Sequence, residues 1–185
     1  LGRWDEAADA AAGTLRVGHG AKPRAGGASC LAHVALGRGD LAEATRQLGV
    51  ACGYLGTHDP MPQQTLPLAR ITIGVAAGEG RLLDARAELA RALVSGIPPG
   101  TQRYGWPLLL AAATAEADSR ALPAAAPGRA EAFERLHEAV KKTTTDTPIW
   151  LAHERWVRAE LARADGRDTA DTWSEAVTAF ECLQR

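Results

Sequence analysis

The chain has 185 residues, of which 46% are hydrophobic and 23% charged, so it is long enough to bury a hydrophobic core. Its 21 Lys and Arg residues against 22 Asp and Glu residues give a formal net charge of -1, which excludes a global electrostatic attraction to nucleic acids or anionic membranes. Alanine accounts for 39 residues, and because alanine is the best helix former, this composition favours closely packed helices.

Helical periodicity and Gly/Pro punctuation predict nine helices. Their expected ranges are 4–17, 28–37, 41–55, 66–77, 82–94, 107–121, 130–142, 149–164 and 172–183. The Gly-rich segment 18–27 is expected to be a loop, and Pro67 and Pro107 are expected in the first turns of their helices, where a missing N–H costs little. The only β-like run, 71–75, lies inside the helical frame, so the expected fold class is all-α.

Two segments are expected to interrupt this series of helices. Gly56 is predicted to cap the helix that ends at residue 55. The sharpest break is Ile97-Pro98-Pro99-Gly100, which fits a turn between repeats as well as a domain boundary. We predict a single helical repeat domain over residues 1–185.

The composition also bears on the cellular setting. Cys30, Cys52 and Cys182 are an odd number within helical patterns, so we expect buried, reduced side chains in a cytoplasmic protein. The sequence shows no signal peptide and no apolar run long enough to cross a bilayer. The excess of Arg (18) over Lys (3) is typical of GC-rich bacterial genomes such as those of actinobacteria. Because the chain starts without Met inside a repeated motif, we expect it to be a fragment of a longer protein.

That motif reads small or turn residue, any, bulky apolar, any, acid, Ala. Copies begin at Gly2, Gly39, Gly80 and Asp171, with a degraded copy at Pro127. The first three copies are 37 and 41 residues apart, a spacing typical of stacked helix pairs. We expect the first residue to end one helix in a left-handed cap and the apolar residue to anchor the returning helix. The acid suits the helix N-terminus, and the alanine permits close approach of the helices.

These residues resemble the tetratricopeptide repeat (TPR), whose second helix opens with Gly-x-aromatic-x-Glu-Ala. Gly2, Trp4, Glu6 and Ala7 match that pattern best, and residues 39–44 match it nearly as well. The repeats after residue 96 depart from the repeat length of about 34 residues. The resemblance therefore implies a degenerate, TPR-like α-α superhelix of about nine helices.

A narrower resemblance lies at the two ends of the chain. Residues 165–170 followed by 173–181 are similar to the helical region of large LuxR-type, MalT-like bacterial transcriptional regulators, and residues 1–13 are similar to their linker repeats. In that family an ATP-binding domain precedes a TPR-like superhelix and a helix-turn-helix follows it. The resemblance implies a non-catalytic interaction or sensor module of such a regulator. The alternative is a generic TPR-like protein–protein scaffold unrelated to transcription.

Three segments look like chemical motifs but depart from them at essential positions. The run 18–23, Gly-His-Gly-Ala-Lys-Pro, lacks the spacing and the Ser/Thr of a P-loop. The helix beginning His153-Glu154 carries Val157 where a zinc protease needs its second histidine. Cys30 and His33 lack a second pair of ligands. We therefore expect no catalytic residues, no metal and no cofactor.

In TPR-like proteins the first helix of each pair lines the concave surface. Aligning Gly39, Gly80 and Gly166 places seven residues toward it, namely Ser29, His33, Arg70, His153, Trp156, Glu160 and Arg163. The last four are spaced i, i+3, i+7, i+10 and share one helix face. Trp156 beside Arg and His suits a peptide or an acidic small ligand, although Trp156 packed between repeats is the simpler interpretation. The expected partner is a protein, a second protomer or a small effector, with no direct contact to nucleic acid or membrane.

Overall fold

The computed structural model describes residues 3–55 and 61–184, and in these ranges it contains helices and no strand. The helices are α1 (Trp4–Val17), α2 (Ala21–Gly37), α3 (Leu41–Leu55), α4 (Pro62–Gly78), α5 (Leu82–Ala92), α6 (Gln102–Asp118), α7 (Arg129–Lys142), α8 (Pro148–Asp165) and α9 (Ala170–Glu181), with short 3-10 turns at Pro123–Ala125 and Cys182–Gln184. The predicted all-α class is confirmed. None of the helices in the described ranges has both the length and the apolar character needed to span a bilayer.

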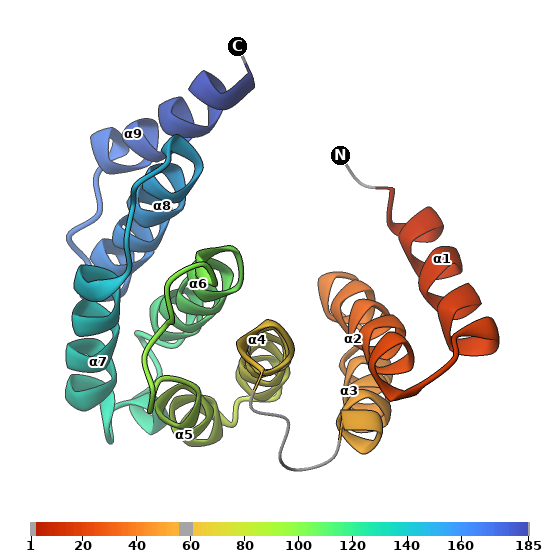
Figure 1. The fold of residues 1–185 in the computed structure, drawn as a ribbon. Coiled ribbons are helices and arrows are strands. Elements are labelled where there is room, and N and C mark those ends of the chain that lie inside the picture. Colours follow the sequence, from red (N-terminus) through yellow and green to blue (C-terminus); the bar gives the residue numbers. More distant parts are fainter. Residues whose placement is uncertain (1–2, 56–60, 185) are drawn as a thin grey trace.

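The helices form an open arch (Figure 1). The even-numbered helices α2, α4, α6 and α8 contact one another in that order and make its inner row, while α3, α5 and α7 lie outside them. At the two ends, α1 packs on α2 and α9 packs on α8. The start of α1 and the short turn that follows α9 lie on the open side of the arch. The inner row therefore presents a continuous surface built from four helices.

Helix α4 joins the two halves of the hydrophobic core. Its residues Ile71 and Val75 belong to a small cluster with α2 and α3, whereas Leu66 and Ile73 belong to the main cluster around Trp106 of α6. A helix buried on two sides must be apolar around most of its circumference, which explains the unusual run of β-branched residues in α4. The β-like segment 71–75 is thus the centre of a buried helix.

The glycines of the repeated motif do turn the chain between helices. Gly39 and Gly80 have φ angles of 77° and 75°, and Gly128 of the degraded copy has 73°. This left-handed conformation is unfavourable for residues with a Cβ atom. The expected left-handed cap is therefore confirmed at Gly39 and Gly80. The expectations for Gly2 and Gly56 fall outside the described residues.

The apolar residue of the motif packs on the next inner helix. Trp4 lies against Gly37 and Leu41 lies against Gly78, which are the last residues of α2 and α4. An added Cβ would come within 2.8 Å of the Trp4 ring at Gly37 and within 2.9 Å of a Leu41 methyl at Gly78. The motif alanine Ala44 is fully buried, as close helix approach requires. The motif thus fixes how one helix pair stacks on the following one.

We predict that Gly39→Ala lowers the free energy of unfolding by about 1 kcal/mol, because alanine must adopt a left-handed conformation there. Gly49, which is exposed in the middle of α3 and would accept a Cβ without any contact within 4 Å, supplies the matched control. Gly49→Ala should raise the free energy by about 0.5–1 kcal/mol through helix propensity. Urea denaturation checks both, and effects of the same sign would contradict the assigned role of Gly39.

The prediction of a loop over residues 18–27 is wrong for most of that segment, since α2 begins at Ala21. Gly27 serves helix packing instead of chain flexibility. A Cβ there would lie 2.9 Å from the Ala11 carbonyl oxygen and 3.3 Å from the Leu15 side chain of α1. The glycine is needed because the two helices approach closely at this point.

The expected positions of Pro67 and Pro107 are also wrong. Both lie inside their helices, because α4 begins at Pro62 and α6 begins at Gln102. Residues that precede proline normally avoid helical conformation. Here those residues are Leu66 and Trp106, which are 2% and 0% exposed. Their burial in the core holds an additional helical turn before each proline.

The fourth motif copy does not have the predicted geometry. Helix α9 already begins at Ala170, so Asp171 lies in its first turn and is no turn residue. The helix is capped by Thr169, whose Oγ1 accepts a hydrogen bond of 3.2 Å from the Thr172 amide. The preceding turn is made by Gly166, with a φ of 69°. The sequence of this copy therefore matches the motif, but its helix begins before the first motif residue and not after it.

The expectation that the cysteines are buried is wrong as well. Cys52 and Cys182 are exposed and Cys30 is half-buried, and all three are free thiols. The helical pattern of the sequence did not reveal that Cys52 lies on an exposed face of α3 and that Cys182 lies in an exposed turn. The exposed thiols have no role in the core.

Candidate functional site

The seven predicted concave-face residues form two separate groups. Ser29 and His33 lie on α2 and Arg70 on α4, whereas His153, Trp156, Glu160 and Arg163 lie on α8. Helices α4 and α6 lie between α2 and α8 in the inner row, so the structure does not bring the two groups into one site (Figure 1). Each group is therefore considered by its own contacts.

On α8, the aromatic residues pack against α9. The ring of Phe180 contacts His153 and Trp156, with centroid distances of 5.2 and 5.8 Å in edge-on geometry. The Ile149 carbonyl lies 2.9 Å from Nδ1 of His153 and accepts its hydrogen bond. Trp156 keeps 38% of its surface exposed. These contacts agree with the simpler interpretation of Trp156 as a packing residue between helices.

The charged residues of α8 are also engaged inside the fold. Glu160 is buried and pairs with Arg163 at 2.7 Å. Arg163 in turn pairs with Asp118 at the end of α6, at 2.8 Å. Glu160 is thus held by an ion pair inside the fold, and its predicted role on the concave surface stays a prediction. The pair of Arg163 and Asp118 joins α6 to α8.

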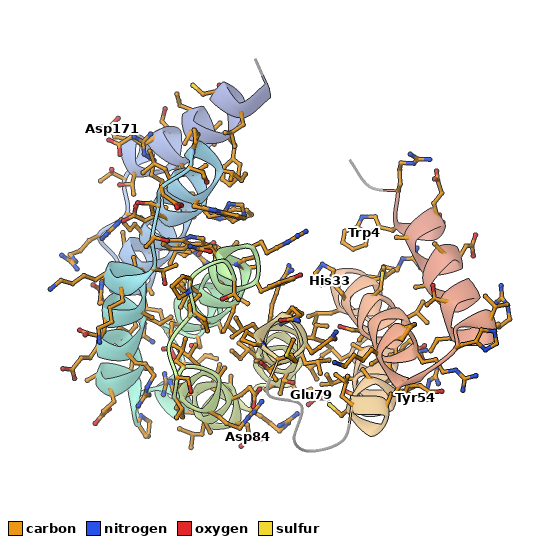
Figure 2. All side chains as sticks on the ribbon, viewed as in Figure 1. Trp4, His33, Tyr54, Glu79, Asp84 and Asp171 are labelled. Atoms are coloured by element: carbon orange, nitrogen blue, oxygen red, sulfur yellow. The ribbon has the colours of Figure 1, made fainter. Side chains whose placement is uncertain are left out.

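The α2 and α4 group has a different character. The His33 ring lies 6.1 Å from the Trp4 ring, and Figure 2 shows these two side chains facing each other between α1 and α2. Burial, and then the positive charge of Arg70, hold the pKa of His33 below its ordinary value. Burial likewise lowers the pKa of the Arg70 guanidinium. In the described part of the chain, Arg70 has neither a carboxylate partner nor a hydrogen bond to its guanidinium.

We predict a pH dependence of stability that originates at His33. Its folded pKa lies below the unfolded value of about 6.5, so the unfolded chain binds more protons in that range. The contribution of neutral His33 is complete above about pH 6.5 and is lost as the pH falls toward the folded pKa. NMR titration should show that Arg70→Met raises the pKa of His33, whereas Arg155→Met on α8 leaves it unchanged. A His33 pKa that does not rise in Arg70→Met would contradict the assignment.

Arg70 lines a groove of about 440 Å³ between α4 and α6. We call this the α4–α6 groove. Its walls come mainly from these two helices, and Leu36 and Leu122 also line it. The wall residues are Arg70, Gly74, Ala77 and Gly78 of α4 and Pro107, Leu110, Ala111, Thr114, Ala115 and Asp118 of α6. A volume of this size is within the range of about 300–1,000 Å³ that holds small ligands.

Sequence reasoning found only one residue of the α4–α6 groove, Arg70. It missed the α6 wall because residues 106–113 are almost continuously apolar, and such a run is typical of a fully buried helix. The structure shows Leu110 and Thr114 half-buried and open to the groove. Their i, i+4 spacing is a helical signal, but it does not distinguish a groove wall from a core face.

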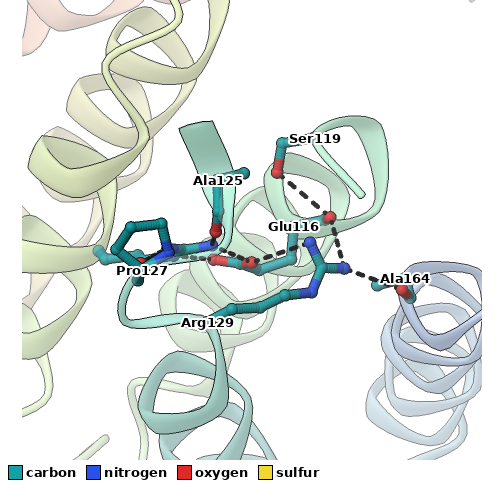
Figure 3. A network of polar contacts seen from close by, with 7 residues as sticks. Glu116, Ser119, Ala125, Pro127, Arg129 and Ala164 are labelled. Carbon is teal, nitrogen blue, oxygen red and sulfur yellow. Dashed lines mark hydrogen bonds and ion pairs between the residues drawn. The ribbon is translucent and has the colours of Figure 1, made fainter. Parts of the chain in front are cut away.

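A second cluster that sequence reasoning missed is a buried ion pair between α5 and α6 (Figure 3). Arg86 donates to Glu116 from Nε at 2.7 Å and from Nη2 at 2.8 Å. Arg86 also donates to the carbonyls of Ala125 and Pro127. The sequence around Arg86 and Glu116 did not indicate that they are buried, since each lies in a helix with other charged residues.

Arg129 extends this network to α8. It donates to the Glu116 carbonyl at 3.2 Å and to the Ala164 carbonyl at 2.8 Å (Figure 3). The cavity beside Arg86 and Glu116 measures about 10 Å³, which is too small for a ligand. Because the polar groups bond to one another and the space is closed, we assign the network a structural role.

No group of three or more His, Cys, Asp or Glu side chains in the described residues is arranged to hold a metal ion. No protein-family model matches the chain, and no curated protein and no solved structure shows significant similarity to it. Functional assignment therefore depends on the motifs and geometry of the chain itself.

Proposed function

We propose that this chain is a non-catalytic, TPR-like interaction module whose inner surface receives a ligand. The observation that carries the proposal is the α4–α6 groove, a mostly apolar cavity on the row of inner helices, whose lining includes Arg70 without a carboxylate partner in the described part of the chain. The polar groups of the Arg86–Glu116 network are bonded within the fold and stabilise the neighbouring helices. A groove of this kind suits binding, since mostly apolar walls with few polar groups are typical of ligand sites.

We further propose that the module belongs to a cytoplasmic LuxR-type transcriptional regulator. The support is the similarity of residues 1–13 and 165–181 to the helical regions of that family. In such a regulator, occupancy of the groove changes the stacking of helix pairs and thereby the state of the ATP-binding and DNA-binding domains. The ligand is then an effector, and the module itself makes no contact with DNA.

The open reading frame that encodes the chain tests this placement. We expect a P-loop upstream of residue 1 and a helix-turn-helix downstream of residue 185. A reading frame with neither would remove the regulator and leave a TPR-like scaffold unrelated to transcription.

In the full-length protein, filling the groove tests the role of the inner surface. Thr114→Trp places a large ring in the groove and should abolish the promoter response to the inducing condition. The control is Leu83→Trp, at an exposed position on the outer helix α5. It should leave the response intact. A normal response from Thr114→Trp would overturn the proposed function.

A further inference from the structure

The charge balance of the α4–α6 groove points to the chemistry of its ligand. Only two charged side chains line the groove within the described residues, Arg70 and Asp118. Asp118 is largely exposed and pairs at 2.8 Å with Arg163, which also pairs with Glu160 at 2.7 Å. Arg70 is half-buried and has no such partner there. Arg70 is therefore the cation of the groove that lacks a carboxylate partner within the described residues.

An unpaired, partly desolvated cation is energetically unfavourable, and an anion bound beside it recovers that cost. Arg70 and His33 are both half-buried. Burial lowers the pKa of Arg70, and burial together with the charge of Arg70 lowers that of His33. A guanidinium presents paired N–H groups that match the two oxygens of a carboxylate. One cation is balanced by a monoanion, whereas a dianion would keep an unpaired charge among apolar walls.

The remaining walls define the body of the ligand. Leu36, Leu82, Leu110 and Leu122 together with Ala77 and Ala111 supply aliphatic surface from several elements, and no aromatic ring lines the groove within the described residues. Aliphatic walls without ring-stacking partners favour a hydrocarbon body, which gains about 0.8 kcal/mol per buried methylene. The volume of about 440 Å³ suits a small molecule.

We propose that the α4–α6 groove binds a small amphipathic carboxylate, with its carboxylate on Arg70 and its hydrocarbon chain along Leu110 of α6. This assignment deepens the proposed function and rests on it for its biological meaning. Thr114 lies one turn beyond Leu110 on the same wall, so its side chain borders the space that the hydrocarbon chain occupies.

The test is isothermal titration calorimetry of the 185-residue chain with octanoate and with octanamide, which has the same chain length and no charge. Octanoate should bind at least about tenfold more tightly than octanamide, as a charge-assisted hydrogen bond predicts. Arg70→Met keeps an apolar side chain of similar reach and should remove this preference. Arg155→Met, which removes a half-buried arginine of α8 that does not line the groove, should preserve it.

Three results would overturn the proposal: no octanoate binding, equal affinities for octanoate and octanamide, or an unchanged preference in Arg70→Met. A second variant, Thr114→Trp, should weaken both ligands by filling the groove, and unaltered binding would place the site elsewhere. Circular dichroism of each variant verifies that the helices remain folded. Failure here removes the carboxylate assignment alone, because the proposed function is tested separately by the reading frame and the promoter response.

Discussion

Glu116→Gln is expected to lower the free energy of unfolding by about 3–5 kcal/mol, the cost of removing one partner from a buried ion pair. Glu116 and Arg86 are only 5% and 9% exposed, so solvent cannot replace the lost charge. The loss also weakens the link between α5 and α6, since Arg86 reaches Glu116 with both Nε and Nη2. Urea denaturation of the purified chain measures the effect.

The matched control removes both charges. Arg86→Met combined with Glu116→Leu keeps side-chain volume in place and removes both members of the buried pair, so the double variant should be more stable than Glu116→Gln alone. Arg129 loses a contact of 4.0 Å with Glu116 and keeps its hydrogen bonds to two backbone carbonyls. It should still be less stable than the natural chain, because the Ala125 and Pro127 carbonyls lose their donor. A double variant as unstable as Glu116→Gln would show that the ion pair is not the source of the loss.

Trp106→Ala is expected to lower the free energy of unfolding by about 3–5 kcal/mol, as large-to-small substitutions in cores do. Trp106 is 0% exposed and lies in the main hydrophobic cluster with residues of α4 and α6. Its removal leaves a cavity inside this cluster. The midpoint and slope of urea denaturation give the change.

Trp106→Phe separates packing from hydrogen bonding at the same position. The indole Nε1 of Trp106 is buried and has no hydrogen-bond partner among the described residues, so phenylalanine removes a polar group that costs about 1–3 kcal/mol when unsatisfied. That gain offsets part of the lost volume, and Trp106→Phe should be clearly more stable than Trp106→Ala. Equal losses in the two variants would contradict the burial of an unsatisfied indole.

The helix boundaries show which parts of the fold are encoded locally. The predicted ranges 4–17 and 41–55 coincide with α1 and α3. Gly39 sets the start of α3 through its own backbone conformation, which a sequence rule can recognise. The starts of α2, α4 and α6 were not predictable in this way, because contacts with distant residues determine them. Leu66 and Trp106 hold the turns before their prolines by burial against other helices.

The same distinction between local sequence and distant contacts applies to the residues of the candidate site. Arg70 was predicted from the repeat frame, since a position within a helix pair is a property of local spacing. The α6 wall and the pairing of Asp118 with Arg163 depend on which helices lie side by side. The α8 residues shared a face as predicted, but that face packs on α9 and α6. Helix periodicity identifies a face and does not identify the partner of that face.

Hydrogen–deuterium exchange of the chain with and without octanoate tests most directly that the inner row of helices is the binding surface. The account predicts slower exchange in α4 and α6, which form the walls of the α4–α6 groove, and unchanged exchange in the outer helices α3 and α7. Protection confined to α8 and α9, around Trp156, or to the outer helices would contradict it.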